Sequence, residues 1–375
     1  MQKIKPNVFN GQDISANEFF DSHWQKSPCL LKNTTVDLTC LPDINTLFDL
    51  ANHEGVQSRI VFTEDEQHYQ AIYDEPEAWQ EITHLKPTLL VSDIEKWFPQ
   101  AMQLMDWFPF IKSWRFDDLM MSYAPKGSSV GAHTDHYDVF LVQIQGSRQW
   151  SYDDQALAHA EMVEDSELAV IKNYQPQHTA ELKAGDILYL PPEIPHHGIS
   201  TSDDCVTCSI GLRAPSNSEL LTAITELATA HMHAQARFKD AVDTSPADAS
   251  IGTHEINYLR QQLQQLAQAS DHELAALFGQ FITGYRLFDE SPEIKVANNQ
   301  VSYQKSPFAV FAYYKTDDSK ANLFVNGECF CTSLAMARTL CDQKTFQLNE
   351  LKKLALDPMN ELRIFHHLID SGAIQ

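Results

Sequence analysis

The stretch VGAHTDHYDVFLVQIQGSRQW, residues 130–150, decides the fold that we expect. His133 and Asp135 lie two positions apart, so in an extended chain both side chains leave the same face. A largely apolar run follows at residues 139–145, and Gly146 then turns the chain into a further extended run. This pattern predicts neighbouring β-strands, with a histidine and a carboxylate placed together just before the first of them.

Short runs of strand-forming residues continue on both sides of this stretch and are separated by Gly, Pro, Asn and Asp. They lie at residues 58–63, 119–123, 187–190 and 206–212. Many short strands without helical repeats between them predict an antiparallel sandwich or barrel. This pattern ends near Pro215, so we expect a first domain over residues 1–214.

From Ser216 the sequence becomes helical, and Ser216 forms a predicted capping box with Glu219. Further along, a Gln-rich helix carries a narrow apolar stripe with steps of three and four residues: Ile256, Leu259, Leu263 and Leu266. Such a stripe suits a second helix. One interpretation is a helical dimerisation region over residues 215–285 with a homodimer built through it. The alternative is that the stripe packs against the chain's own domains.

Residues 286–375 mix predicted strands with three short helices, which is typical of a winged-helix module. Basic and acidic residues nearly balance there, although the whole chain has 27 Lys and Arg against 51 Asp and Glu, a formal net charge of −24. Nucleic-acid binding needs a basic surface, so direct binding of nucleic acid is not expected. The excess of acidic residues favours a basic protein partner.

The chain offers no sign of a membrane or secretory destination. No segment approaches the run of about 18 apolar residues that spans a bilayer, and the first residues lack the apolar core of a secretory signal. The 7 cysteines are sparse and odd in number. We expect a cytoplasmic protein with reduced thiols and no membrane association.

A second motif, LKAGDILYLPPEIPHHGIS at residues 182–200, supplies a further histidine. Two imidazoles and one carboxylate on one side of a metal form the facial triad of non-haem Fe(II) oxygenases. Only one of His196 and His197 points inward if the backbone is extended; we choose His196 and place His197 at the rim. The prediction is an Fe(II) site made of His133, Asp135 and His196, against the alternative of solvated surface residues.

The extended run after Gly146 presents Arg148, Trp150 and Tyr152 in alternation. An arginine on the inner face of a barrel is costly unless it pairs with an anion. A guanidinium holds a carboxylate through two parallel hydrogen bonds, so Arg148 is the expected anchor for the distal carboxylate of 2-oxoglutarate. The alternative is an arginine on the outer face of the strand.

These motifs resemble one family: the Jumonji-C (JmjC) ribosomal oxygenases, in particular the bacterial arginine hydroxylases of large-subunit ribosomal protein sixteen. The resemblance is sharpest in HTDHYDVF at 133–140, GDILYLPP at 185–192 and GLRAP at 211–215. It implies an α+β, mainly β fold: a double-stranded β-helix (cupin) barrel, then a helical dimerisation region and a winged-helix-like module. It also implies that His133, Asp135 and His196 bind iron and that Arg148 binds 2-oxoglutarate.

The chain departs from the family where Ala124 replaces a hydroxyl residue that often assists the cosubstrate. Ser122 lies on the same strand face and is the expected substitute. Tyr137 and Asp138 follow the metal motif and are the candidates for contact with the protein substrate, with barrel packing and turn capping as the alternative roles.

Together these features predict an Fe(II)- and 2-oxoglutarate-dependent hydroxylase that acts on an arginine side chain of a basic ribosomal protein. One alternative is a JmjC oxygenase with another substrate, such as a histone or a small molecule. The other is a non-enzymatic regulator in which a ligand-sensing cupin barrel is joined to a DNA-binding winged helix.

Overall fold

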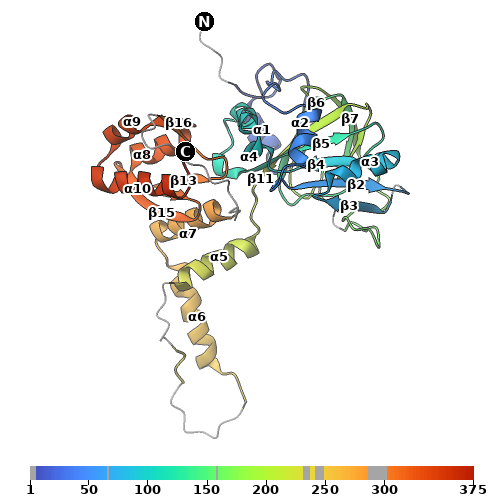
Figure 1. Cartoon of the computed structure of the whole chain (residues 1–375). Helices are drawn as coiled ribbons and strands as arrows, with labels where there is room; N and C mark the ends of the chain where they lie inside the picture. The colour runs from blue at the N-terminus through green and yellow to red at the C-terminus, as the bar shows by residue number, and fades with distance from the viewer. Residues whose placement is uncertain (1–5, 66, 158, 231–236, 241–248, 286–301) are drawn as a thin grey trace. The chain divides into compact units, whose positions relative to one another are not determined.

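The computed structural model describes residues 6–65, 67–157, 159–230, 237–240, 249–285 and 302–375 (Figure 1). The chain forms two compact units, residues 1–214 and 215–375. The first unit ends where the strand-rich pattern was expected to end. The boundary expected between residues 285 and 286 adjoins a stretch that lies outside the described residues.

Two antiparallel sheets make up most of the first unit. The larger has eight strands in the order β1-β9-β6-β11-β5-β4-β2-β3, and the smaller has the order β10-β7-β8. The large sheet comprises β1 (Cys29–Leu31), β9 (Ile187–Leu190), β6 (Asp138–Gln145), β11 (Cys205–Leu212), β5 (Phe116–Ala124), β4 (Thr88–Val91), β2 (Ser58–Thr63) and β3 (Tyr69–Tyr73). The small sheet comprises β10 (His196–Ser200), β7 (Ser147–Tyr152) and β8 (His178–Lys183). The predicted strands are present, and β1, β3, β4, β8 and β10 add to them.

Short helical segments accompany the sheets. They are α1 (Ala16–Ser22), α2 (Ile44–Ala51), α3 (Trp79–Ile82) and α4 (Ile94–Trp97), with the 3₁₀ turns η1 (Pro76–Ala78), η2 (Thr83–Leu85), η3 (Pro99–Trp107) and η4 (Ser113–Arg115). Ser15 caps α1 in a reciprocal bond pair with Glu18. The fold of this unit is therefore mainly β with several helices, as expected.

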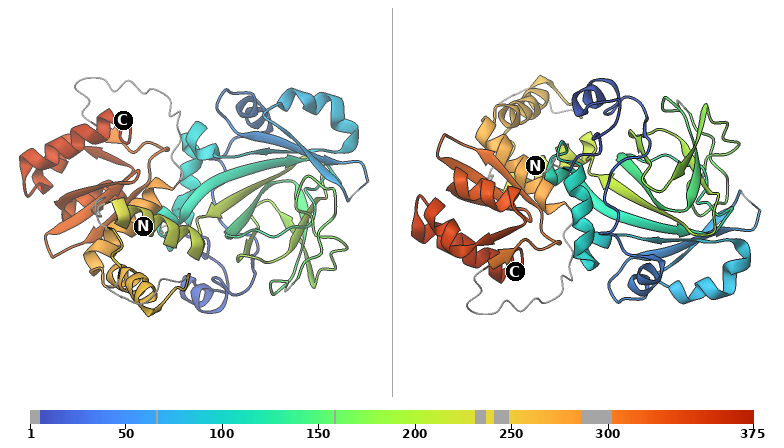
Figure 2. Two further views of the ribbon diagram at one scale, coloured as in Figure 1. Left: turned by 90° about the horizontal axis from the view of Figure 1, so that it is seen from below. Right: turned by 90° about the horizontal axis from the view of Figure 1, so that it is seen from above.

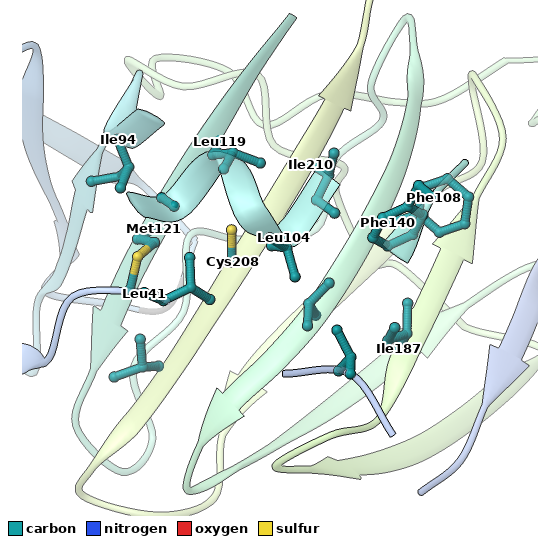
Figure 3. Packing of buried hydrophobic residues seen from close by; sticks show 14 of the residues in the cluster. Leu41, Ile94, Leu104, Phe108, Leu119, Met121, Phe140, Ile187, Cys208 and Ile210 are labelled. Atoms are coloured by element: carbon teal, nitrogen blue, oxygen red, sulfur yellow. The ribbon is translucent and has the colours of Figure 1, made fainter. Parts of the chain in front are cut away.

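The main hydrophobic core covers one face of the large sheet (Figure 3). Side chains from neighbouring strands pack there beneath α4 and η3; the labelled members include Leu119, Met121, Phe140, Cys208, Ile210, Ile94 and Leu104. Their burial removes apolar area from water, which stabilises the fold by about 25 cal/mol per Å². This is the dominant favourable term in folding.

The opposite face of the large sheet packs against the small sheet. Leu141 and Leu188 from the large sheet share a cluster with Trp150 and Leu182 from the small sheet. Because side chains alternate along a strand, residues opposite in face to Met121 line this interior. Ser122, which pairs with Thr207, is one of them. The space between the two sheets is where the candidate site lies.

Three helices open the second unit: α5 (Asn217–Ala230), α6 (Thr253–Ala267) and α7 (Asp271–Gly284). The predicted capping box before α5 is confirmed, since the Ser216 backbone N–H donates to Glu219 and the Glu219 backbone N–H donates to the Ser216 hydroxyl. Ser270 and Glu273 form another before α7.

The described part of the terminal module contains two further small sheets and three helices. It is coloured orange to red in Figure 2. Its elements are β12 (Ser302–Gln304), β13 (Phe311–Lys315), β14 (Lys320–Val325), β15 (Glu328–Ser333), α8 (Leu334–Asp342), β16 (Thr345–Gln347), α9 (Leu348–Leu354) and α10 (Pro358–Asp370). α7 packs so closely on β14 that a side chain at Gly279 would overlap the ring of Phe324. α7 thus shares its packing with the terminal strands, and a helical dimerisation region over residues 215–285 stays a prediction. A winged-helix identity for this module stays a prediction.

Within the part of the chain that the structure describes, no helix combines the length and apolar character needed to cross a membrane.

Candidate metal centre

His133 and His196 are brought side by side by the backbone. The two residues form an isolated antiparallel bridge, in which the His133 N–H donates to the His196 carbonyl at 3.0 Å and the His196 N–H donates back at 2.9 Å. The Asp135 carbonyl accepts the N–H of Glu193 at 2.7 Å, which ties the next part of the loop to the same segment. His133 and Asp135 therefore lie in a loop that is fastened to the start of β10 and comes just before β6, as the sequence pattern predicts.

Three side chains converge at this point. One potential ligand atom from each of His133, Asp135 and His196 lies within 4.8 Å of the others, and the His196 Nε2 is 3.6 Å from the Asp135 Oδ2. Among the described residues, no second group of three His, Cys, Asp or Glu side chains converges in this way. The structure thus brings together the three residues that the sequence motifs singled out.

Both imidazoles are oriented by backbone carbonyl groups. The Nδ1 of His133 lies 3.0 Å from the Gly131 carbonyl oxygen, and the Nδ1 of His196 lies 3.0 Å from the Ile194 carbonyl oxygen. A carbonyl oxygen only accepts, so each Nδ1 carries the proton and each Nε2 presents a lone pair. Burial lowers the pKa of His196 to about 4, and the nearby His133 lowers it to a smaller extent. The His196 ring is therefore neutral near pH 7.

This donor set suits a divalent transition metal. Two neutral imidazole nitrogens and one carboxylate oxygen on one side of an ion leave the other coordination positions open, which is typical of non-haem Fe(II) oxygenases. Hydrogen bonds from the second nitrogen of each imidazole are a usual feature of metal-binding histidines. The residues present therefore fit the predicted metal.

His197 is directed elsewhere. Its Nε2 lies 2.8 Å from the Ser129 hydroxyl, and in β10 it alternates in face with His196. Burial lowers the pKa of His197 to about 4, with further contributions from His133 and Arg148. The structure therefore leaves His196 as the histidine of this pair that joins the cluster.

Arg148 lies on β7, opposite Ser200 of β10, and is only 4% exposed. Its Nε and Nη2 have no hydrogen-bond acceptor among the described residues, and its guanidinium carbon is 5.6 Å from the centre of the Trp150 ring. A buried cation without an anionic partner is costly. The guanidinium therefore fits a ligand carboxylate, as the alternation along the strand predicts.

Ser122 lies inside the barrel, as expected from its strand face. It is buried, and its hydroxyl donates to the Thr207 carbonyl across a long 3.5 Å. Ala124, two residues further on the same face, is fully buried. The part of Ser122 in cosubstrate binding stays a prediction.

Tyr137 lies two residues after Asp135 and remains 40% exposed. Partial burial raises the pKa of its phenol, and the carboxylates of Asp135 and Asp118 raise it further. The ring thus lies near carboxylates and near Arg59, and part of its surface is open to a partner.

Asp138 has a different environment. It is fully buried, and its carboxylate accepts hydrogen bonds from the Tyr189 hydroxyl at 2.6 Å, from Arg115 at 2.8 Å and from Gln25 at 3.1 Å. These partners leave it without access to a substrate. The expectation that Asp138 contacts the substrate is corrected: this carboxylate fastens the N-terminal segment and β9 to the start of β6.

Gly131 was not singled out by the sequence motifs, yet it supports the metal site. Its φ of +86° is unfavourable for other residues, and a Cβ there would lie 2.9 Å from Val170 and 3.1 Å from the Tyr69 ring. Val170 comes from a hairpin whose Ile171 N–H donates to the Ala132 carbonyl at 2.7 Å. Only the Gly-rich character of this segment could have pointed to the constraint.

Replacing Gly131 with alanine should weaken metal binding about tenfold or more, because it displaces the carbonyl that orients His133. Titration with Co(II), followed by its visible absorption, measures this affinity. Gly185→Ala is the matched control: its φ is also positive, at +90°, but a Cβ there meets only the Thr34 carbonyl at 3.5 Å. It should lose stability while keeping the metal affinity, and an equal loss of affinity in both variants would contradict the role given to Gly131.

Comparison with known proteins gives this geometry a family. The JmjC domain family matches residues 103–220, and the AraC-like ligand binding domain matches residues 176–290. The ribosomal protein uL16 3-hydroxylase of Escherichia coli is 30% identical over 292 residues, which span 76% of this chain and 75% of that protein. The chain belongs to the JmjC-domain ribosomal oxygenases. A probable ribosomal oxygenase of Haemophilus influenzae is 34% identical over 218 residues, which span 57% of this chain but only 54% of that relative.

Solved structures of a ribosomal oxygenase show the same fold. The X-ray structure of E. coli YcfD matches with a TM-score of 0.80 at 24% identity, over 97% of this chain and 98% of that one. The structure of E. coli YcfD in complex with cobalt and 2-oxoglutarate matches with a TM-score of 0.78, also at 24% identity and with the same shares of each chain. The sequence-based resemblance to ribosomal oxygenases and the predicted JmjC barrel are confirmed.

Proposed function

We propose that this ribosomal oxygenase uses Fe(II) and 2-oxoglutarate to hydroxylate an arginine side chain of ribosomal protein uL16. The observation that carries the proposal is the cluster of His133, Asp135 and His196, whose ligand atoms lie within 4.8 Å of one another beside an unpaired buried arginine. Two matched relatives add support: one is named a uL16 3-hydroxylase, and YcfD has been solved with cobalt and 2-oxoglutarate.

The residues of the site have separate proposed roles. His133, Asp135 and His196 would hold the metal, with each histidine kept in the ligating tautomer by a carbonyl group. Arg148 would grip the distal carboxylate of 2-oxoglutarate from the inner face of β7. When bound, iron and 2-oxoglutarate together supply the power to oxidise an unactivated C–H bond, and the barrel walls orient the target and exclude bulk water.

The surroundings of Tyr137 favour a cationic target. Asp118 and Asp135 lie close enough to Tyr137 to affect the ionisation of its phenol. An exposed aromatic face with Asp118 nearby suits a guanidinium, which stacks on rings. The net charge of −24 also favours approach of a basic ribosomal protein.

A direct test compares protein substrates. The purified protein with Fe(II) and 2-oxoglutarate is incubated with uL16, with a histone or alone, and succinate release is measured. We expect uL16 to raise release well above both controls. Equal release in all three reactions would contradict uL16 as the substrate, and a shift of duplex DNA in a gel without succinate release would favour the regulator.

We also propose that α6 pairs with a second copy of the chain. Ile256, Leu259 and Leu263 are 47%, 57% and 61% exposed, so the stripe is not buried by the chain's described residues. The side chain of Leu266 lies outside the described set. A second copy is the commonest means of covering such a seam.

Replacing Leu259 and Leu263 together with glutamate should convert dimers into monomers, because two carboxylates per chain would be buried without partners across the seam. Light scattering at micromolar concentration measures the mass. The matched control replaces Gln261 and Gln265 with glutamate, which adds the same charge on the opposite face of α6. It should leave the dimer intact, and a monomeric unmodified protein would contradict the proposal.

A further inference from the structure

Trp150 is buried inside the barrel, and the proposed mechanism gives it no role. It lies on β7 between Arg148 and Tyr152, faces the interior with Arg148, and is only 4% exposed. In register, its partner across the small sheet is Gly198 of β10. It packs in the cluster that joins the two sheets, which includes Leu141 and Leu188.

The seat of the indole depends on the glycine opposite. A Cβ on Gly198 would lie 2.7 Å from Cζ3 and 2.8 Å from Cη2 of the Trp150 ring. Real Cβ atoms do not approach aromatic carbons so closely, so any side chain at Gly198 would push the indole aside. The reason for glycine at this position is space, since its backbone needs no left-handed conformation.

The same ring reaches both halves of the candidate site. Its centre lies 5.6 Å from the guanidinium carbon of Arg148 and 5.8 Å from the centre of the His196 ring. Trp150 therefore lies near both the proposed cosubstrate anchor and a proposed metal ligand. An indole held in this way restricts the direction of the Arg148 side chain.

The indole N–H is also unpaired. The Nε1 of Trp150 is buried and has no acceptor among the described residues. Indole nitrogen is a donor only, and a buried donor without a partner is unfavourable. Arg148 has two nitrogens in the same state. The two side chains thus carry unpaired buried donors on one face of one strand, an environment that a bound anion satisfies.

We propose that Trp150 is a second hydrogen-bond donor to 2-oxoglutarate, acting beside Arg148 through its indole N–H, and that Gly198 provides the room for its ring. This inference rests on the proposed function, since it assumes that the cosubstrate occupies the barrel interior. It adds a binding residue and a spacing requirement to the anchor already assigned to Arg148.

Nuclear magnetic resonance of the full-length protein tests the hydrogen bond directly. The protein is labelled with ¹⁵N in its 6 tryptophans, loaded with diamagnetic Zn(II) and titrated with 2-oxoglutarate. The signal that is missing from Trp150→Phe identifies the Nε1–H of Trp150. We expect this proton to move downfield on titration more than the other five, because hydrogen bonding to a carboxylate deshields it.

Calorimetry of the Zn(II)-loaded protein then measures the affinity for 2-oxoglutarate. Trp150→Phe should raise the dissociation constant about tenfold, the effect of losing one hydrogen bond to a charged acceptor. Trp79→Phe is the matched control, because Trp79 is buried beside Phe48 and Tyr123 in the other core. It should leave the constant unchanged.

A double-mutant cycle tests the role of Gly198. Gly198→Ala alone should weaken 2-oxoglutarate binding, but it should add little in the Trp150→Phe background, because the displaced indole is already gone. Additive effects would overturn the spacing requirement. A Trp150 signal that does not move, with an unchanged dissociation constant in Trp150→Phe, would overturn the hydrogen bond while wild-type binding upholds the proposed function. Failure of the wild-type protein to bind 2-oxoglutarate would overturn both.

Discussion

Alanine at His133, Asp135 or His196 should abolish Fe(II)-dependent turnover of 2-oxoglutarate, with a loss of more than about 100-fold in each variant. Loss of a mere hydrogen-bond partner of a metal ligand already costs about 10- to 100-fold, and each of these changes removes a ligand itself. Succinate release measures turnover, and circular dichroism checks that the fold is retained.

His197→Ala is the matched control for this series. It removes a neighbouring imidazole whose Nε2 lies 2.8 Å from the Ser129 hydroxyl and does not join the cluster. This variant should keep most of the turnover. An inactive His197→Ala protein beside an active His196→Ala protein would show that the wrong histidine has been assigned to the metal.

Replacing Arg148 with methionine should raise the dissociation constant for 2-oxoglutarate tenfold or more. The change keeps much of the apolar stem but removes a charged hydrogen-bonding partner, which contributes about 2 kcal/mol or more in a closed site. Calorimetry with the metal-loaded protein measures the constant. The dissociation constant of Arg148→Lys should lie between those of the wild-type protein and Arg148→Met, because lysine keeps the charge but lacks the planar fork of the guanidinium.

Thermal stability provides a second measurement for Arg148→Met. Without ligand, the buried guanidinium of Arg148 leaves two nitrogens unpaired among the described residues, so methionine should not lower the melting temperature and should raise it slightly. Adding 2-oxoglutarate should stabilise the wild-type protein far more than the variant. Loss of stability with unchanged affinity would mean that Arg148 supports the fold and that another residue holds the cosubstrate.

The local features of the site were predictable because they depend on short spacing. The two-residue step from His133 to Asp135, the choice of His196 after a proline, and the alternation that turns Arg148 inward all follow from backbone geometry over a few residues. The isolated pairing of His133 with His196 was not predictable, because its partner lies at the start of β10, distant in sequence, and such pairings carry no local signal.

The misjudged and missed residues depend on contacts that are distant in sequence. Asp138 is followed by a strand and resembles a loop carboxylate, but its partners Gln25, Arg115 and Tyr189 come from three separate segments. Gly131 is constrained by Val170. The sequence singled out Trp150 only as part of a run whose side chains alternate in face. The position of its ring depends on Gly198, its partner across the small sheet.

The most direct test of the whole account is the mass of uL16 in cells. Mass spectrometry of ribosomal proteins compares a strain that makes this protein with one that makes its Asp135→Ala variant. We expect one arginine of uL16 to carry an added oxygen atom only in the first strain. An unmodified uL16 in both strains, or the same added oxygen in both, would contradict the claim that this chain is a uL16 arginine hydroxylase.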